Sequence, residues 1–245
     1  MTETAASFSV LGTEGTIRGS GELPASTLQR IGDRWAALEL WFSLGRPDSE
    51  LSLVRAGRKA ILETRPEVRA AHLDAIRWRT LTRGHFPTHR ADGLLDLSGL
   101  ARAYALRDAA LELTDAGVDS WLAEAGNEVV SDALGGAGWT TDIPDPVHET
   151  GSLATVPLGG SWTAIATSHA DVRSPEGEFV QASVFGRDIV CVGVLAAAVV
   201  AGGSGSFELV GERWPVDVLA VRRSGEMWST PRVARFLLQS SDVTA

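Results

Sequence analysis

Residues 96–105 read Asp-Leu-Ser-Gly-Leu-Ala-Arg-Ala-Tyr-Ala and open the strongest helical pattern of the chain. Apolar residues recur behind this opening at helical spacing and predict one buried side, which comprises Leu100, Tyr104, Leu111 and Leu113. Gly117 follows and supplies a stop, because glycine readily adopts the backbone conformation that ends a helix. We therefore expect a helix that begins beside Ser98 and Gly99.

The start of this helix suits an anion. The free N–H groups of a first helical turn and the positive end of the helix dipole point to one spot. Gly99 lets a ligand approach the backbone, and Arg102 in the first turn can add a charge-assisted contact. The simpler alternative is an ordinary surface helix capped by Ser98, and so short a motif does not decide between the two.

Strand and helix patterns alternate along the rest of the chain. Strands at 7–11 and 13–18, around Gly12, predict an opening hairpin, and a helix follows Ser26, its expected N-cap. We expect further helices at 68–78 and at 189–201, the latter capped by Asp188. Further strands are expected at 120–125, 139–143, 162–166, 216–222 and 226–229. The pattern indicates an α+β fold in a single domain, residues 1–245, of two lobes.

Composition disfavours several classes of function. The 245 residues carry a formal charge of -9 without a Lys/Arg cluster, which argues against nucleic-acid binding. The longest apolar run, residues 189–201, is shorter than the roughly 20 residues that cross a bilayer, so we expect a core helix. Residues 1–7 lack a signal-peptide pattern, and Cys191 has no partner for a disulfide within the chain. We predict a cytoplasmic protein without membrane insertion.

The stretch at 96–105 resembles Asp-Leu-Gly-Gly-Ile-Ala-Lys-Gly-Tyr-Ala, a motif of the ApbE family, the FAD:protein FMN transferases. Other segments resemble motifs of that family in the same order along the chain, and this colinearity makes the set far more specific than any one motif. These segments are residues 11–17, 47–52, 84–88, 124–128, 139–146 and 164–168. The chain thus resembles a divergent member of the family.

The resemblance implies a fold, a ligand and a reaction. The fold would be a single ApbE-like, T-fold-related domain of two lobes, with mixed sheets packed against helices. The ligand would be FAD, and the reaction the Mg²⁺-dependent transfer of FMN from FAD to a threonine or serine of a partner protein. The residues expected to bind FAD are Ser98, Gly99, Arg102, Glu124, Ala125, Thr167 and Ser168. Arg102 replaces the family's lysine, and Glu124 replaces an asparagine.

The family's metal ligands are missing from the matching positions. In the family, an aspartate and a threonine four residues apart supply oxygen to Mg²⁺, and the matching residues here are Val192 and Ala196. Magnesium demands oxygen ligands, which neither side chain offers. A shift of register could bring Asp188 to the site instead. The family's His-x-x-Asp-Pro motif is reduced to a proline at residues 172–175, so we assign no catalytic residue and no metal ligand.

Three functional hypotheses follow. The first is an active FAD:protein FMN transferase, and the second is a pseudoenzyme that binds FAD but is impaired in catalysis because its metal ligands are replaced. The third is a non-catalytic protein-interaction subunit that has lost the flavin site. We favour the second, since a shared fold does not carry function once the site residues have changed.

Overall fold

A large antiparallel sheet forms the centre of the protein, seen in a computed structural model that describes residues 3–89, 93–132, 138–147, 151–170 and 177–242. Eight strands form this sheet in the order β1-β2-β3-β4-β7-β8-β9-β10, and β5 and β6 form a separate pair. The strands are β1 (Thr4–Val10), β2 (Thr13–Gly19), β3 (Trp121–Ala125), β4 (Glu128–Ser131), β5 (Thr140–Pro144), β6 (Ser152–Pro157), β7 (Ala164–His169), β8 (Phe179–Gly186), β9 (Asp217–Arg222) and β10 (Met227–Ser229).

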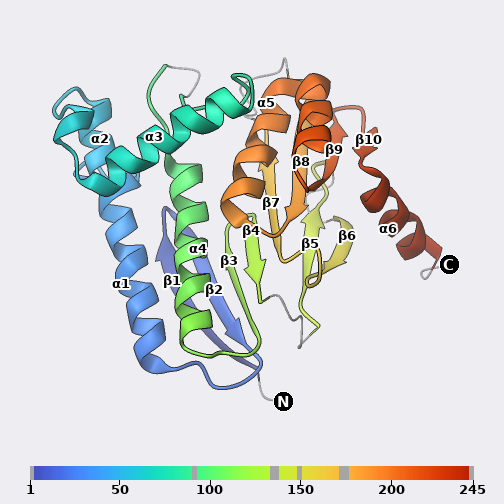
Figure 1. Cartoon of the computed structure of the whole chain (residues 1–245), viewed down its shortest axis with the longest axis horizontal. Coiled ribbons are helices and arrows are strands. Elements are labelled where there is room, and N and C mark those ends of the chain that lie inside the picture. Colours follow the sequence, from blue (N-terminus) through green and yellow to red (C-terminus); the bar gives the residue numbers. More distant parts are fainter. Residues whose placement is uncertain (1–2, 90–92, 133–137, 148–150, 171–176, 243–245) are drawn as a thin grey trace.

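The sheet topology confirms the α+β class and corrects one detail of it. Each strand pairing in the described residues is antiparallel, whereas we expected mixed sheets. Neighbouring strands of the large sheet reverse direction each time, including β4 and β7, which are separated along the chain by the β5–β6 pair. Because the sheet runs from β1 to β10 without a break, the two expected lobes share one sheet (Figure 1).

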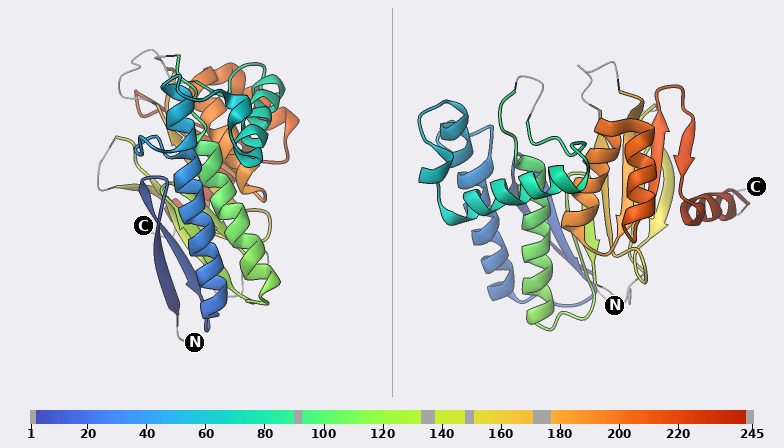
Figure 2. Two further views of the ribbon diagram at one scale, coloured as in Figure 1. Left: turned by 90° about the vertical axis from the view of Figure 1, so that its left-hand side faces the viewer. Right: turned by 45° about the horizontal axis from the view of Figure 1, so that its top comes forward.

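Three long helices cover one face of this sheet. In all, the described residues form the helices α1 (Ala25–Phe42), α2 (Glu50–Arg55), α3 (Pro66–Leu81), α4 (Ser98–Asp115), α5 (Ile189–Arg213) and α6 (Pro231–Asp242), with a short 3₁₀ turn at Ile61–Glu63. Of these, α1, α4 and α5 lie side by side on the sheet (Figures 1 and 2). Trp35 of α1 is fully buried, and its indole N–H donates to the Ala105 carbonyl of α4 at 2.9 Å.

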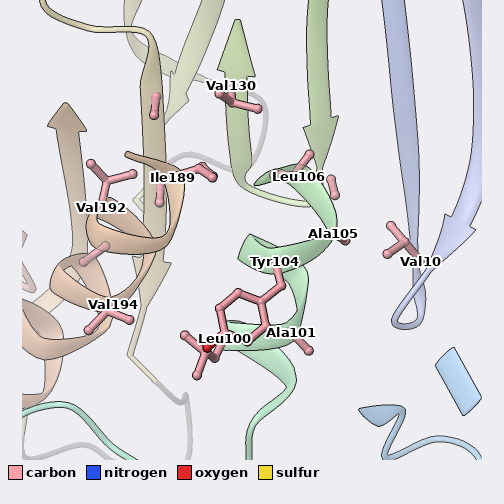
Figure 3. Close-up of a cluster of buried hydrophobic side chains, with 14 of the residues drawn as sticks. Val10, Leu100, Ala101, Tyr104, Ala105, Leu106, Val130, Ile189, Val192 and Val194 are labelled. Carbon is pink, nitrogen blue, oxygen red and sulfur yellow. The ribbon is translucent and has the colours of Figure 1, made fainter. Parts of the chain in front are cut away.

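Apolar side chains fill the space between the helices and the sheet. Figure 3 shows part of this core, in which Leu100 and Tyr104 of α4 lie near Val192 and Val194 of α5. The opposite face of the sheet is buried too, under the β5–β6 pair and α6. This second core comprises Leu122, Val129, Trp139, Ile143, Val156, Leu158, Trp162, Ile165, Phe185, Leu219 and Val233. The central strands are therefore apolar on both faces.

Helix α5 is longer than the sequence predicted. It begins as expected, with the Asp188 carboxylate accepting hydrogen bonds from the backbone N–H groups of Val190 and Cys191. It then continues past residue 201 across a kink at Gly203, where φ is 61°. By length and composition α5 could cross a membrane, but half of its apolar window is buried inside the protein, where it packs on β7, β8 and α4. These contacts are those of a core helix.

Two details of the predicted helices are wrong. Ser26 lies inside α1, whose N-cap is Pro24, because the chain already turns into the helix at Ala25. Leu111 of α4 is 57% exposed, so the buried side of α4 is formed by the other three predicted residues and by alanines between them, which let α1 and α5 approach closely. The opening hairpin, the β9–β10 hairpin and the helix at 68–78 are confirmed.

Candidate functional site

A cavity of about 110 Å³ lies beside the start of α4. It is bounded by the first turn of α4, the ends of β4 and β7, and the middle of α5. The residues that line it are Phe86, Gly99, Leu100, Arg102, Ala103, Glu128, Ala166, Thr167, Ser168, Gly193, Val194, Ala196 and Ala197. Segments far apart in the sequence thus meet where the predicted anion-binding turn begins.

A second cavity of about 200 Å³ adjoins the first on the other side of β4. The two share Glu128 and Thr167. The second cavity lies under the β5–β6 pair and is lined by Glu124, Gly126, Asn127, Glu128, Val129, Thr141, Asp142, Ile143, Pro144, Ile165 and Thr167. Taken together, the two volumes reach only the lower end of the roughly 300–1,000 Å³ that is usual for small-molecule sites.

The first turn of α4 is partly occupied by its own chain. One carboxylate oxygen of Asp96 accepts from the Ser98 backbone N–H at 2.9 Å and from the Ser98 hydroxyl at 2.6 Å. Ser98 therefore directs its donors at Asp96, and it does not line the cavity. Gly99, the next residue, is exposed and does line it. Of the residues expected to bind an anion at this turn, Ser98 is therefore excluded, and the role falls to Gly99 and the residues after it.

Arg102 is the cation of the first cavity, and it is paired with Glu128. Its Nε lies 3.4 Å from the Glu128 Oε1, which is longer than the roughly 2.7–2.9 Å of a strong charge-assisted hydrogen bond. Glu128 is only 9% exposed, and its Oε2 is buried without a hydrogen-bond partner. Burial raises the pKa of Glu128 to about 7, and Arg102 opposes that rise. The cavity therefore holds a loose pair with one carboxylate oxygen unsatisfied.

The sequence predicted Glu124 as an FAD-binding residue and did not predict Glu128, which lies four residues later. Both lie in the β3–β4 hairpin, which turns at Gly126 with φ of 58°, but Glu124 pairs with Val129 and Glu128 with Ala125. Glu124 is half-buried and lines only the second cavity, while Ala125 is fully buried and lines neither. The hairpin pattern could have placed both carboxylates near the turn, but which of them is buried depends on α4 and α5.

The two candidate residues of β7 do lie at the cavities. Thr167 lines both of them, donates its backbone N–H to the Asn127 carbonyl at 2.9 Å, and shares a hydroxyl hydrogen bond of 2.8 Å with Ser183. Ser168 lines the first cavity. Asn127 also bonds His169 at 3.3 Å, which ties the β3–β4 turn to the end of β7.

Of the two α5 positions that match the family's metal ligands, one faces the cavity and the other does not. Val192 is fully buried and its side chain packs toward Gly186 of β8, so it does not reach the cavity. Ala196 lines the cavity as expected, together with Gly193, Val194 and Ala197. None of these side chains carries an oxygen. The glycine leaves room for the Glu128 carboxylate, which would lie 3.9 Å from a Cβ at Gly193.

Asp188 does not supply a ligand to this cavity. It caps α5 and lines a separate cleft together with Arg187 and Cys191. Within the described ranges, no group of three His, Cys, Asp or Glu side chains is placed to hold a metal ion. The segment at 172–175, where the family's His-x-x-Asp-Pro motif would fall, lies outside the described residues.

Comparison with known proteins shows which family this chain is similar to. The ApbE family model matches residues 87–178, and no curated protein matches the sequence. The flavin transferase ApbE from Vibrio cholerae shares the fold with a TM-score of 0.73 at 19% identity, covering 94% of this chain and 97% of that one. Pseudomonas stutzeri flavinyl transferase ApbE in its apo form gives 0.74 at 17% identity, covering 96% and 97%.

A third structure, the ApbE protein from Thermotoga maritima, gives a TM-score of 0.76 at 17% identity and covers 96% of this chain and 99% of that one. At such identities the solved structures establish the fold alone. The family model adds a match in sequence over the segment that carries the start of α4, the β3–β4 turn and β7. The chain is thus similar to the ApbE family in sequence over residues 87–178, and it shares the fold of the ApbE structures.

Proposed function

We propose that this protein binds FAD, with the diphosphate at the start of α4. The observation that carries the proposal is the meeting of the exposed Gly99 and the guanidinium of Arg102 on one cavity. The backbone N–H groups at a helix start and the positive end of its dipole favour phosphate, and an arginine can hold two phosphate oxygens at once. Ser168 lines the same cavity from β7 and adds a hydroxyl.

The flavin ring would extend into the second cavity. That cavity adjoins the first at Glu128 and Thr167 and is walled by the β5–β6 pair. Glu124 lines it and would face the ring and not the diphosphate, which removes the like-charge repulsion that a carboxylate beside phosphate would cause. Both cavities are small, so the ligand has to displace side chains at their junction.

We further propose that FMN transfer is impaired. Mg²⁺ requires a near-octahedral array of oxygen ligands, and the side chains that α5 presents to the cavity have none. The one carboxylate in the cavity wall, that of Glu128, is engaged by Arg102. The side chains present at the cavity therefore do not fit the metal, and the phosphoryl transfer would lack the cation that neutralises its developing charge.

A second function, a protein-interaction subunit without flavin, is favoured by one observation. Arg102 is already paired inside the protein, and the cavity beside it is small. In either case we propose a cytoplasmic location and contact with a protein partner. Under the first proposal this partner would be a protein that presents a threonine or serine as FMN acceptor, or a protein descended from such an acceptor.

Titration with FAD distinguishes these functions. The purified protein is scanned for flavin absorbance and then titrated with FAD with and without Mg²⁺. AMP release is measured with a threonine-containing acceptor peptide. We expect FAD to bind with an affinity that Mg²⁺ leaves unchanged and no AMP to appear. Mg²⁺-dependent AMP release would show an active transferase, and failure to bind any flavin would favour the interaction subunit.

A further inference from the structure

We propose that this protein takes up a proton when it binds the diphosphate of FAD, and that Glu128 is the group that accepts it. The incoming anion replaces Glu128 as the partner of Arg102, and the released carboxylate takes a proton from solvent to become a neutral carboxyl. The inference rests on the proposed function, because it concerns the same cavity and the same arginine.

The geometry makes Arg102 a shared partner. Arg102 lines the cavity where the diphosphate would lie, and among the described residues its ionic partner is Glu128, whose Oε1 lies 3.4 Å from the Arg102 Nε. That distance is too long for a strong charge-assisted hydrogen bond, whereas a phosphate can accept two parallel N–H donors from a guanidinium. A diphosphate therefore competes well for Arg102.

The burial of Glu128 decides what happens once Arg102 turns away. Glu128 is 9% exposed and its Oε2 has no hydrogen-bond partner. A buried carboxylate that loses its counterion is strongly destabilised, and it neutralises instead of remaining charged. In the free protein the pKa of Glu128 is already raised to about 7, with burial as the largest cause. Near neutral pH, protonation of Glu128 therefore costs less free energy than keeping its carboxylate charged without a counterion.

The other titratable groups near Glu128 belong to β3, β5 and β7. From β3 and β5, the carboxylates Glu124 and Asp142 line the adjoining cavity, whereas the pKa of Glu128 is set by its burial and by Arg102. Helix α5 presents the uncharged Gly193. His169, at the end of β7, bonds Asn127 in the same hairpin, so it needs its own control.

FAD titrations at several pH values test the proposal. The diphosphate of FAD stays fully ionised across this range, so the ligand itself contributes no titration there. If only the protonated protein binds, the apparent Kd is the intrinsic Kd divided by the protonated fraction, so it should rise about tenfold from pH 6 to pH 8. Glu128→Gln should bind with a Kd independent of pH, and His169→Gln should keep the tenfold change. Riboflavin, which lacks phosphate, should show no pH dependence.

A calorimetric measurement on the unaltered protein tests the same proposal without a substitution that could disturb folding. Titration of FAD at pH 7 in buffers of different ionisation enthalpy should report uptake of about half a proton per FAD, since Glu128 is then about half protonated before binding. A Kd that is constant from pH 6 to pH 8, with no proton uptake, would overturn the inference while leaving FAD binding intact. Absence of FAD binding at every pH would overturn both.

Discussion

Glu128 shows how far the local environment can move one residue away from its ordinary behaviour. The carboxyl of Glu128 lies at the cavity between α4 and α5, and Arg102 is its counterion within the part of the chain that the structure describes. Its ionised form is disfavoured by burial, which raises the pKa of Glu128 to about 7 from 4.5. A folded-state pKa above the unfolded one means that the native state binds the proton more tightly, so the group stabilises the fold most at low pH.

Removing this group should therefore change how stability depends on pH. The contribution of Glu128 is present below its unfolded pKa of 4.5 and is lost as the pH rises through its folded value of about 7. Relative to Glu128→Gln, the unaltered protein should lose on the order of 2–3 kcal/mol of unfolding free energy between pH 5 and pH 8. Urea unfolding of both proteins at the two pH values measures this difference. Parallel pH profiles would contradict it.

The site residues divide into those that sequence can place and those that it cannot. Gly99 and Arg102 belong to a helix start that is local in sequence, and both do line the cavity. Ser98 lies beside them, but its donors go to Asp96, a competition that the motif does not reveal. Glu128 gains its character from burial by two helices that are remote in sequence, so the choice of Glu124 could not be corrected without the fold.

At the scale of elements, helix α5 depends on a glycine at its kink. Gly203 has φ of 61°, and a Cβ there would lie 2.6 Å from an Oε2 atom of Glu178. The same oxygen accepts the backbone N–H of Ser204 at 2.8 Å and so restarts the helix after the kink. The positive φ thus favours glycine at this point, and a Cβ there would in addition force the Glu178 carboxylate to shift away from Ser204.

Gly203→Ala should consequently destabilise the protein by about 1–3 kcal/mol, because it combines a left-handed backbone with a steric clash. Gly205→Ala is the matched control two residues later in the same helix, since nothing lies within 4 Å of a Cβ at Gly205. We expect that variant to change stability by no more than about 0.5 kcal/mol. Urea midpoints compare the two, and equal midpoints would show that the kink tolerates a side chain.

Elements with a clear local pattern were predictable, whereas strand β8, which is covered on both faces, was not. The β1–β2 hairpin, α4 and the capped start of α5 have local signals. Strand β8 was missed although it pairs with both β7 and β9. Seven of its eight residues are buried, because helices cover one face and the β5–β6 layer and α6 cover the other. A strand buried on both faces has no alternation to detect.

At the scale of the whole molecule, the candidate site depends on both layers of the protein. The helical layer contributes Gly99, Arg102 and Gly193, while the sheet contributes Glu128 and Thr167. The second cavity adds the β5–β6 pair on the far side of the sheet. The site therefore lies where the sheet meets the helices on one face and β5 on the other, and it depends on the complete fold that the chain shares with ApbE structures. Figure 2 shows the helical layer against the sheet.

The FAD affinities of two arginine variants test the account most directly. Arg102→Gln removes the cation of the cavity, while Arg107→Gln makes the same change of charge on the same helix, at an exposed residue paired with Asp108. Hydrogen bonds to charged groups contribute about 1.5–3 kcal/mol, so Arg102→Gln should weaken FAD binding at least tenfold and Arg107→Gln should leave it unchanged. FAD binding that is equally tight in both variants, or absent from the unaltered protein, would contradict a diphosphate site at the start of α4.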